Sequence, residues 1–213
     1  MGTTKRNIMV MICSLACIVG ITFSAKLLKH IDISWLRIAA KVGINLLNGA
    51  VAWIAAKLVG IKIDIDFANK RQYLIGIAIA LSLSTMIAVI PALCGVSLVG
   101  NHVDFSWFVM IRDFLFFLLI IGPVEELVFR IYLQSAVVSL FRNHKWIGVV
   151  IASFLFGLFH LINGSFIQVV FTFGIGLVFG FAKYKIKDCK YLGLSLAHGL
   201  YDFLNTLVTF FVV

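Results

Sequence analysis

The sequence has 213 residues, of which 62% are hydrophobic and only 13% are charged. Soluble domains carry about 25% charged residues, so this composition excludes an ordinary soluble protein and is typical of a polytopic helical membrane protein. The net charge of +9 does not indicate nucleic-acid binding, because membrane proteins use Lys and Arg as cytoplasmic anchors that contact anionic lipid. We therefore predict an all-α transmembrane helical bundle, a single integral membrane domain over residues 1–213, with anionic lipid as a partner and no nucleic acid.

Seven apolar stretches follow one another along the chain, and about 20 residues are enough to cross a bilayer core of about 30 Å. We predict spans over residues 8–28, 34–60, 73–99, 105–122, 146–162, 165–183 and 192–212. The first resembles a signal peptide at its basic start, but it stays apolar as far as Leu28 and is expected to be a retained helix. Lys and Arg gather before the first span and in alternate loops, so the positive-inside rule predicts a cytoplasmic N-terminus and an outside C-terminus.

The fourth span is ambiguous in length. A continuous helix over residues 105–141 would be about 55 Å long, nearly twice the thickness of the bilayer core. Gly122 and Pro123 offer a kink, after which the helix could run at a slant into the cytoplasmic interface. Two separate crossings in this region are the alternative, and they would give eight spans.

Ionisable residues inside apolar spans are costly and are functional candidates by default. Glu126 and Arg130 stand at positions i and i+4 with the acid first, the order that favours a helical ion pair. Glu125 lies about 100° round the helix, and a residue five positions on points away from it in an α-helix. We therefore predict a structural Glu126–Arg130 pair and a Glu125 carboxylate without an intrahelical partner, suited to act as a general base. Alternatively, both acids only join helices through hydrogen bonds.

His160 ends the fifth span. If the fourth and fifth spans form an antiparallel hairpin that turns near Asn143, Glu125 lies 18 residues before the turn and His160 lies 17 after it. Equal path lengths predict that the two side chains lie at the same depth and share a water molecule. A hydrogen-bonded structural histidine is the alternative.

The last span contains His198 and Asp202, which share one helix face at positions i and i+4. The chain has no HExxH, no GxSxG and no glycine-rich phosphate loop. A base-like Glu, two His and an Asp favour activation of water for hydrolysis of a peptide bond. The same residues leave two other readings open: a divalent metal such as zinc held by Glu125, His160 and His198, and a proton relay in a proton-coupled transporter.

Three motifs in order resemble the signature of the CPBP family (CAAX protease and bacteriocin-processing, or Abi) of intramembrane proteases. They are Glu125-Glu126-x-x-x-Arg130, Phe156-x-x-x-His160 and His198-x-x-x-Asp202. The resemblance covers about residues 105–210 and implies a helical catalytic core at about 105–212, with its cavity inside the bilayer. It also implies that Glu125 and His160 activate water while His198 and Asp202 stabilise the oxyanion. Glu126, Arg130 and Phe156 would support this site. The last motif position is often Asn in the family, so Asp202 departs from the pattern.

The resemblance also bears on cofactor, substrate and location. Both a metal-free glutamate mechanism and a metalloprotease mechanism stay open. The expected substrate is a membrane-embedded or membrane-associated protein or peptide, prenylated or not. The small size resembles bacterial members linked to bacteriocin immunity, which favours a bacterial cell membrane. A non-catalytic scaffold or immunity protein of the same fold is the alternative function.

Overall fold

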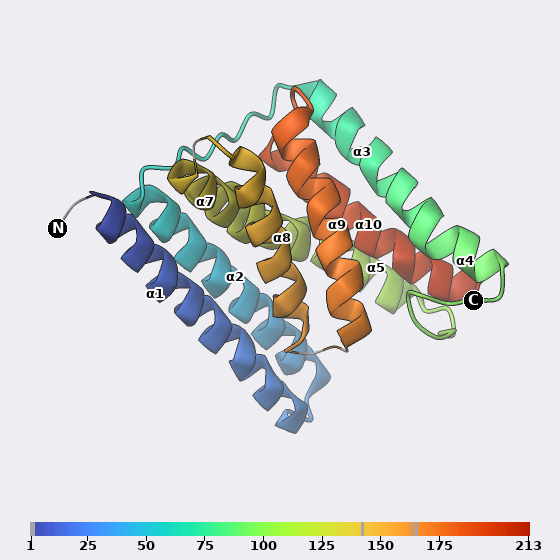
Figure 1. Ribbon diagram of the computed structural model, residues 1–213. Helices are drawn as coiled ribbons and strands as arrows, with labels where there is room; N and C mark the ends of the chain where they lie inside the picture. Colours follow the sequence, from blue (N-terminus) through green and yellow to red (C-terminus); the bar gives the residue numbers. More distant parts are fainter. Residues whose placement is uncertain (1–2, 142, 163, 165) are drawn as a thin grey trace. The chain divides into compact units, whose positions relative to one another are not determined.

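The computed structural model describes residues 3–141, 143–162, 164 and 166–213. These residues form helices, with two longer connections between α2 and α3 and between α4 and α5, and no strand occurs among them (Figure 1). The predicted all-α class is therefore confirmed. The contacts divide the chain into two units, unit 1 with Met1–Asp64 and Val124–Lys187, and unit 2 with Ile65–Pro123 and Asp188–Val213. The prediction of a single membrane domain stays a prediction.

Unit 1 is built mainly from helices of the first third and the middle of the chain. They are α1 (Thr3–Ser24), η1 (Ala25–His30), α2 (Ser34–Leu58), η4 (Leu127–Gln134), α7 (Ser135–Leu140), α8 (Lys145–His160) and α9 (Phe166–Lys185). Helices α1 and α2 run side by side, joined by a 2.9 Å bond from Asn48 Nδ2 to Thr22 Oγ1 (Figure 1). The hydroxyl groups of Ser14 and Tyr132 lie 2.6 Å apart and join α1 to η4. The first helix is thus packed into unit 1, as expected for a retained span.

Unit 2 brings together two segments that are distant in the sequence. Its helices are α3 (Lys70–Ser84), η2 (Thr85–Val89), α4 (Ile90–Leu93), α5 (Trp107–Phe116), η3 (Phe117–Ile121) and α10 (Tyr191–Phe211). Glycines let α10 approach its neighbours closely. A Cβ atom on Gly193 would collide with the main-chain carbonyl of Gln72 on α3, and one on Gly199 with that of Phe117 on η3. Helix α10 is therefore held in backbone contact on both sides.

Among the residues that the structure describes, five helical runs are long and apolar enough to cross a membrane. They are Thr4–Leu28, Ser34–Leu58, Lys70–Leu93, Trp107–Leu140 and Phe166–Lys185. Helix α8 is apolar but shorter, and α10 is long enough but less apolar. The third run ends before the predicted residue 99, because Gly95 turns the chain with a φ of +80°. The predicted start of the sixth span at residue 165 lies outside the described residues. The helices thus agree with a polytopic helical bundle of about seven spans.

The fourth predicted span is a single helical run of 34 residues, Trp107–Leu140. A helix that reverses direction must break, so the continuous run favours one crossing over two in this region. The run contains two π-helical stretches, η3 and η4, on either side of the short helix α6 (Gly122–Glu126). Pro123 has no N–H to donate to the preceding turn, and a shift to i→i+5 bonding is one way in which a helix accommodates such a disruption. The regular α-helix assumed from the sequence is therefore wrong at η3 and η4.

Candidate active site

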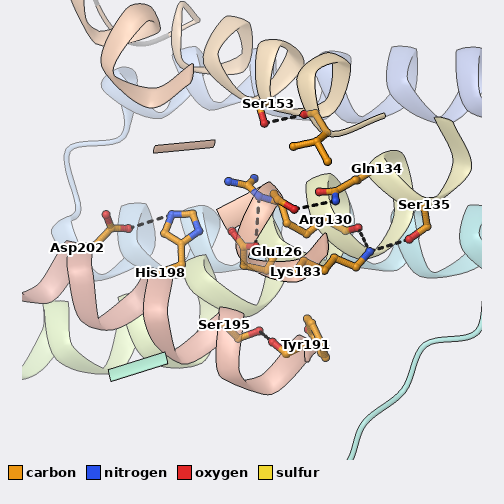
Figure 2. A network of polar contacts seen from close by, with 12 residues as sticks. Glu126, Arg130, Gln134, Ser135, Ser153, Lys183, Tyr191, Ser195, His198 and Asp202 are labelled. Atoms are coloured by element: carbon orange, nitrogen blue, oxygen red, sulfur yellow. Dashed lines mark hydrogen bonds and ion pairs between the residues drawn. The ribbon is translucent and has the colours of Figure 1, made fainter. Parts of the chain in front are cut away.

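Glu126 and Arg130 form the predicted ion pair. Arg130 Nε lies 3.3 Å from Glu126 Oε2, and the two side chains are 1% and 0% exposed (Figure 2). Breaking a pair that is this deeply buried leaves one charge uncompensated, which is far more costly than breaking a surface pair. The pair therefore fixes the conformation of the segment that carries Glu125.

Glu125 is half-buried, in contrast to its fully buried neighbour. Glu125 lies in the short helix α6, directly before the π-helix η4 that carries Arg130. The prediction that Glu125 lacks an intrahelical partner stays a prediction.

The guanidinium group of Arg130 is also enclosed by aromatic rings. Its central carbon lies 4.3 Å from the ring centroid of Phe156 on α8 and 5.5 Å from that of Phe179 on α9. Such contacts favour Arg because a planar cation stacks on the ring quadrupole. Phe156, predicted as a supporting residue, therefore lies directly on the buried charge. Phe179 had no signal in the sequence, since it is one of 20 phenylalanines.

The imidazole ring of His160 also contacts the ring of Phe156. The two ring centroids lie 4.7 Å apart in a T-shaped arrangement, and His160 Nδ1 lies 2.9 Å from the main-chain oxygen of Phe156. A carbonyl oxygen only accepts, so Nδ1 must be the protonated nitrogen in this bond. In the neutral ring the acceptor is then Nε2, the nitrogen that a general base or a water-orienting group requires. His160 itself is half-buried.

The predicted hairpin between the fourth and fifth spans is present. Helix α8 packs against α7 and η4. Phe129 is 14 residues before Asn143, Phe156 is 13 after it, and their rings lie 5.1 Å apart. Equal path lengths from the turn therefore do bring residues of the two arms together. The same register, one turn further on, supports the predicted common depth of Glu125 and His160.

His198 and Asp202 lie together on α10, in unit 2. His198 Nε2 is 3.5 Å from Asp202 Oδ2, with His198 buried and the Asp202 side chain 23% exposed (Figure 2). One turn before His198, the Ser195 hydroxyl donates to the main-chain oxygen of Tyr191 over 2.8 Å. Tyr191 in turn donates its hydroxyl to the main-chain oxygen of Pro123 over 3.0 Å. These contacts belong to unit 2, and those of Glu126, Arg130, Phe156 and His160 belong to unit 1.

The sequence-based choice of site residues did not include Lys183. It lies on α9, and its ammonium group donates to the main-chain oxygen of Arg130 and to Ser135 Oγ (Figure 2). Its position within an apolar helix, ahead of the loop, was the signal available. Among the described residues, no three His, Cys, Asp or Glu side chains form a metal-binding group. The metal set of Glu125, His160 and His198 draws on both units and stays a prediction.

Residues 105–204 match a family described as type II CAAX prenyl endopeptidase, Rce1-like. All three motifs, from Glu125 to Asp202, fall inside this match. Over these residues the chain is similar to the CAAX-type proteases of the CPBP family. Its apolar helices are those of an integral membrane protein. Comparisons with curated proteins and with solved structures find no match.

Proposed function

We propose that this protein is an intramembrane endopeptidase that hydrolyses peptide bonds of membrane-associated proteins or peptides. The observation that carries the proposal is that a segment of the CPBP family contains Glu125, His160, His198 and Asp202 in their motif positions. The buried Glu126–Arg130 pair and the aromatic contact between Arg130, Phe156 and His160 support it, because they fix the two helices that carry the first two residues.

In the proposed reaction, Glu125 and His160 activate one water molecule. Nε2 of His160 accepts one hydrogen bond from the water and orients it, while the Glu125 carboxylate takes the proton as the water oxygen attacks the carbonyl carbon. The C–N bond of the tetrahedral intermediate then breaks as that proton passes to the leaving nitrogen. The products are a carboxylate and an amine, so no further reactant is needed.

His198 and Asp202 are proposed to stabilise the oxyanion. Asp202 accepts a hydrogen from Nε2 of His198 and thereby orients the ring. The imidazolium form then offers Nδ1–H as a donor to the developing negative charge. In this role Asp202 acts through His198 and need not donate a hydrogen bond, which accounts for an Asp where the family often has Asn.

The substrate class follows from the family. A CAAX-type peptidase acts on membrane-associated chains, and prenylated C-termini are the substrates its description names. A bacterial cell membrane with the N-terminus in the cytoplasm remains our proposal for its location. If a divalent metal takes part, Glu125, His160 and His198 would hold it, and it would supply a Lewis acid.

Two variants test the proposal in purified protein reconstituted in vesicles. Glu125→Gln removes the proposed base. His160→Asn keeps an N–H donor for the main-chain oxygen of Phe156 but lacks Nε2, the nitrogen proposed to orient the water. Both are expected to fold and to lose at least about 100-fold in cleavage of a prenylated CAAX-type peptide. Asp104→Asn, in a fully exposed connection, is the matched control. The proposal is wrong if both variants melt like wild type and still cleave.

Chelator sensitivity of the wild type separates the metal-dependent from the metal-free mechanism. A substrate-dependent proton flux would favour a transporter.

A further inference from the structure

A lysine from a neighbouring helix binds the π-helix that carries Arg130. Lys183 lies in the last turn of α9, and its side chain is half-buried, whereas Lys185 in the same turn is exposed. Its ammonium group donates to the main-chain oxygen of Arg130 and, over 2.7 Å, to Ser135 Oγ (Figure 2). The ammonium group of a lysine carries three N–H donors that need acceptors when they leave water. Two of the acceptors here are the main-chain oxygen of Arg130, within η4, and Ser135 Oγ, in the residue that directly follows η4.

At Ser135 the π-helix has ended and α7 begins. The N–H of Ser135, the first residue after η4, bonds to the oxygen of Tyr132. Lys183 thus donates to a main-chain oxygen and to a side-chain oxygen at the junction where η4 ends.

The rest of the same face of α9 also holds η4. Gln134 Nε2 donates to the main-chain oxygen of Gly180 over 3.0 Å. Gly180 permits this approach, since a Cβ atom there would lie 3.2 Å from Gln134 Oε1 and 2.8 Å from a methyl carbon of Val149. Phe179 lies on the Arg130 guanidinium. Three residues of α9, Phe179, Gly180 and Lys183, therefore contact the segment between Arg130 and Ser135.

We infer that Lys183 is a positioning residue, whose bonds at the end of η4 hold in place the segment that carries Arg130 and its ion pair with Glu126. The inference rests on the proposed function for its effect on catalysis. Without Lys183, the end of η4 loses two contacts with α9, so the Arg130 side chain and the Glu126 carboxylate paired with it can shift. Glu125, which directly precedes Glu126, then changes its orientation.

The test compares three variants in vesicles. Lys183→Met keeps the approximate length of the side chain and removes its N–H donors. It is expected to lower kcat at least about tenfold and to leave KM within about twofold of wild type. The reason is that a small misplacement of a catalytic group acts on the chemical step. Lys183→Arg restores two donors and is expected to recover most of kcat. Lys185→Met, an exposed lysine on the same helix, is the matched control and should resemble wild type. Rescue by Arg separates positioning from a general loss of packing.

The outcomes distinguish the inference from the proposed function. If Glu125→Gln is inactive and Lys183→Met keeps the wild-type kcat, the inference is wrong and the proposed function stands. If wild type and Glu125→Gln cleave equally, the proposed function is wrong. The inference is then judged by amide hydrogen exchange of Leu127–Gln134, which Lys183→Met should accelerate and Lys183→Arg should restore. Unchanged exchange in Lys183→Met would overturn it, and the same measurement applies if Lys183→Met is too unstable for kinetics.

Discussion

Arg130 is the residue on which the polar contacts of unit 1 converge. It pairs with Glu126 and contacts the rings of Phe156 and Phe179. A cation inside a membrane protein is tolerated where carboxylates and aromatic faces replace the water it has lost. One guanidinium therefore links the Glu-Glu motif of the fourth span to the Phe-x-x-x-His motif of the fifth.

The Glu126–Arg130 pair should govern stability more than chemistry. Glu126→Gln leaves the guanidinium without its paired carboxylate and is expected to lower the free energy of unfolding by about 3 kcal/mol. The double variant Glu126→Gln/Arg130→Gln removes both charges and should cost less than the sum of the two single variants. Reversible unfolding in mixed micelles measures all three. Equal unfolding free energies for Glu126→Gln and wild type would show that the pair does not stabilise the fold.

At the scale of residues, the sequence predicts contacts that depend on short helical spacing. Glu126–Arg130 and His198–Asp202 were found because i,i+4 neighbours meet in any α-helix. The π-helical stretches η3 and η4 were missed, because nothing in the local residues distinguishes a π-helix from an α-helix. Lys183 was missed for a different reason: its acceptor is a main-chain oxygen 53 residues away in sequence.

At the scale of elements, helix α10 shows how small residues position a functional helix. Gly193 and Gly199 place its backbone against the carbonyls of Gln72 and Phe117. Hydrophobicity alone does not drive helices together in lipid, so close packing through small residues takes its place. The sequence predicts α10 by its length and apolar content. It does not reveal which glycines touch a neighbour, since 17 glycines occur in the chain.

Two glycine variants separate packing from helix propensity. Gly199→Ala would bring a Cβ atom against the oxygen of Phe117 and to 2.8 Å from the Cα of Leu118. Both are main-chain atoms that cannot move aside, so we expect a loss of about 1–3 kcal/mol in the free energy of unfolding. Gly174→Ala in α9 is the matched control, because nothing lies within 4 Å of its Cβ position. That variant should be neutral or gain about 0.5–1 kcal/mol. Equal effects of the two variants would contradict the packing argument.

At the scale of the whole molecule, the chain passes from one unit to the other three times, after Asp64, Pro123 and Lys187. Composition and the lengths of apolar stretches were enough to predict a helical membrane protein of about seven spans. They were not enough to predict this partition, which depends on contacts between distant segments. Within unit 2, polar side chains join the two segments near their ends: Lys190 Nζ donates to Asp66 Oδ2 over 3.1 Å, and Asn69 Nδ2 donates to Asp188 Oδ1 over 3.2 Å.

The Asp66–Lys190 contact should make the joining of the two segments sensitive to acid. The hydrogen bond from Lys190, helped by the main-chain N–H of Ala68, lowers the pKa of the Asp66 carboxyl from its ordinary value. A lowered pKa in the folded state contributes stability that is present above the unfolded value of about 3.9 and is lost as the pH falls through the folded pKa. Lys190→Met removes the largest cause, so the pKa of Asp66 should rise toward its ordinary value, and the part of the acid loss of stability that Asp66 contributes should shrink. A carboxyl titration by ¹³C NMR measures the first effect and acid unfolding the second, with the exposed Lys187→Met as control. An Asp66 carboxyl that titrates identically in Lys190→Met and wild type would show that Lys190 does not hold the two segments together in this way.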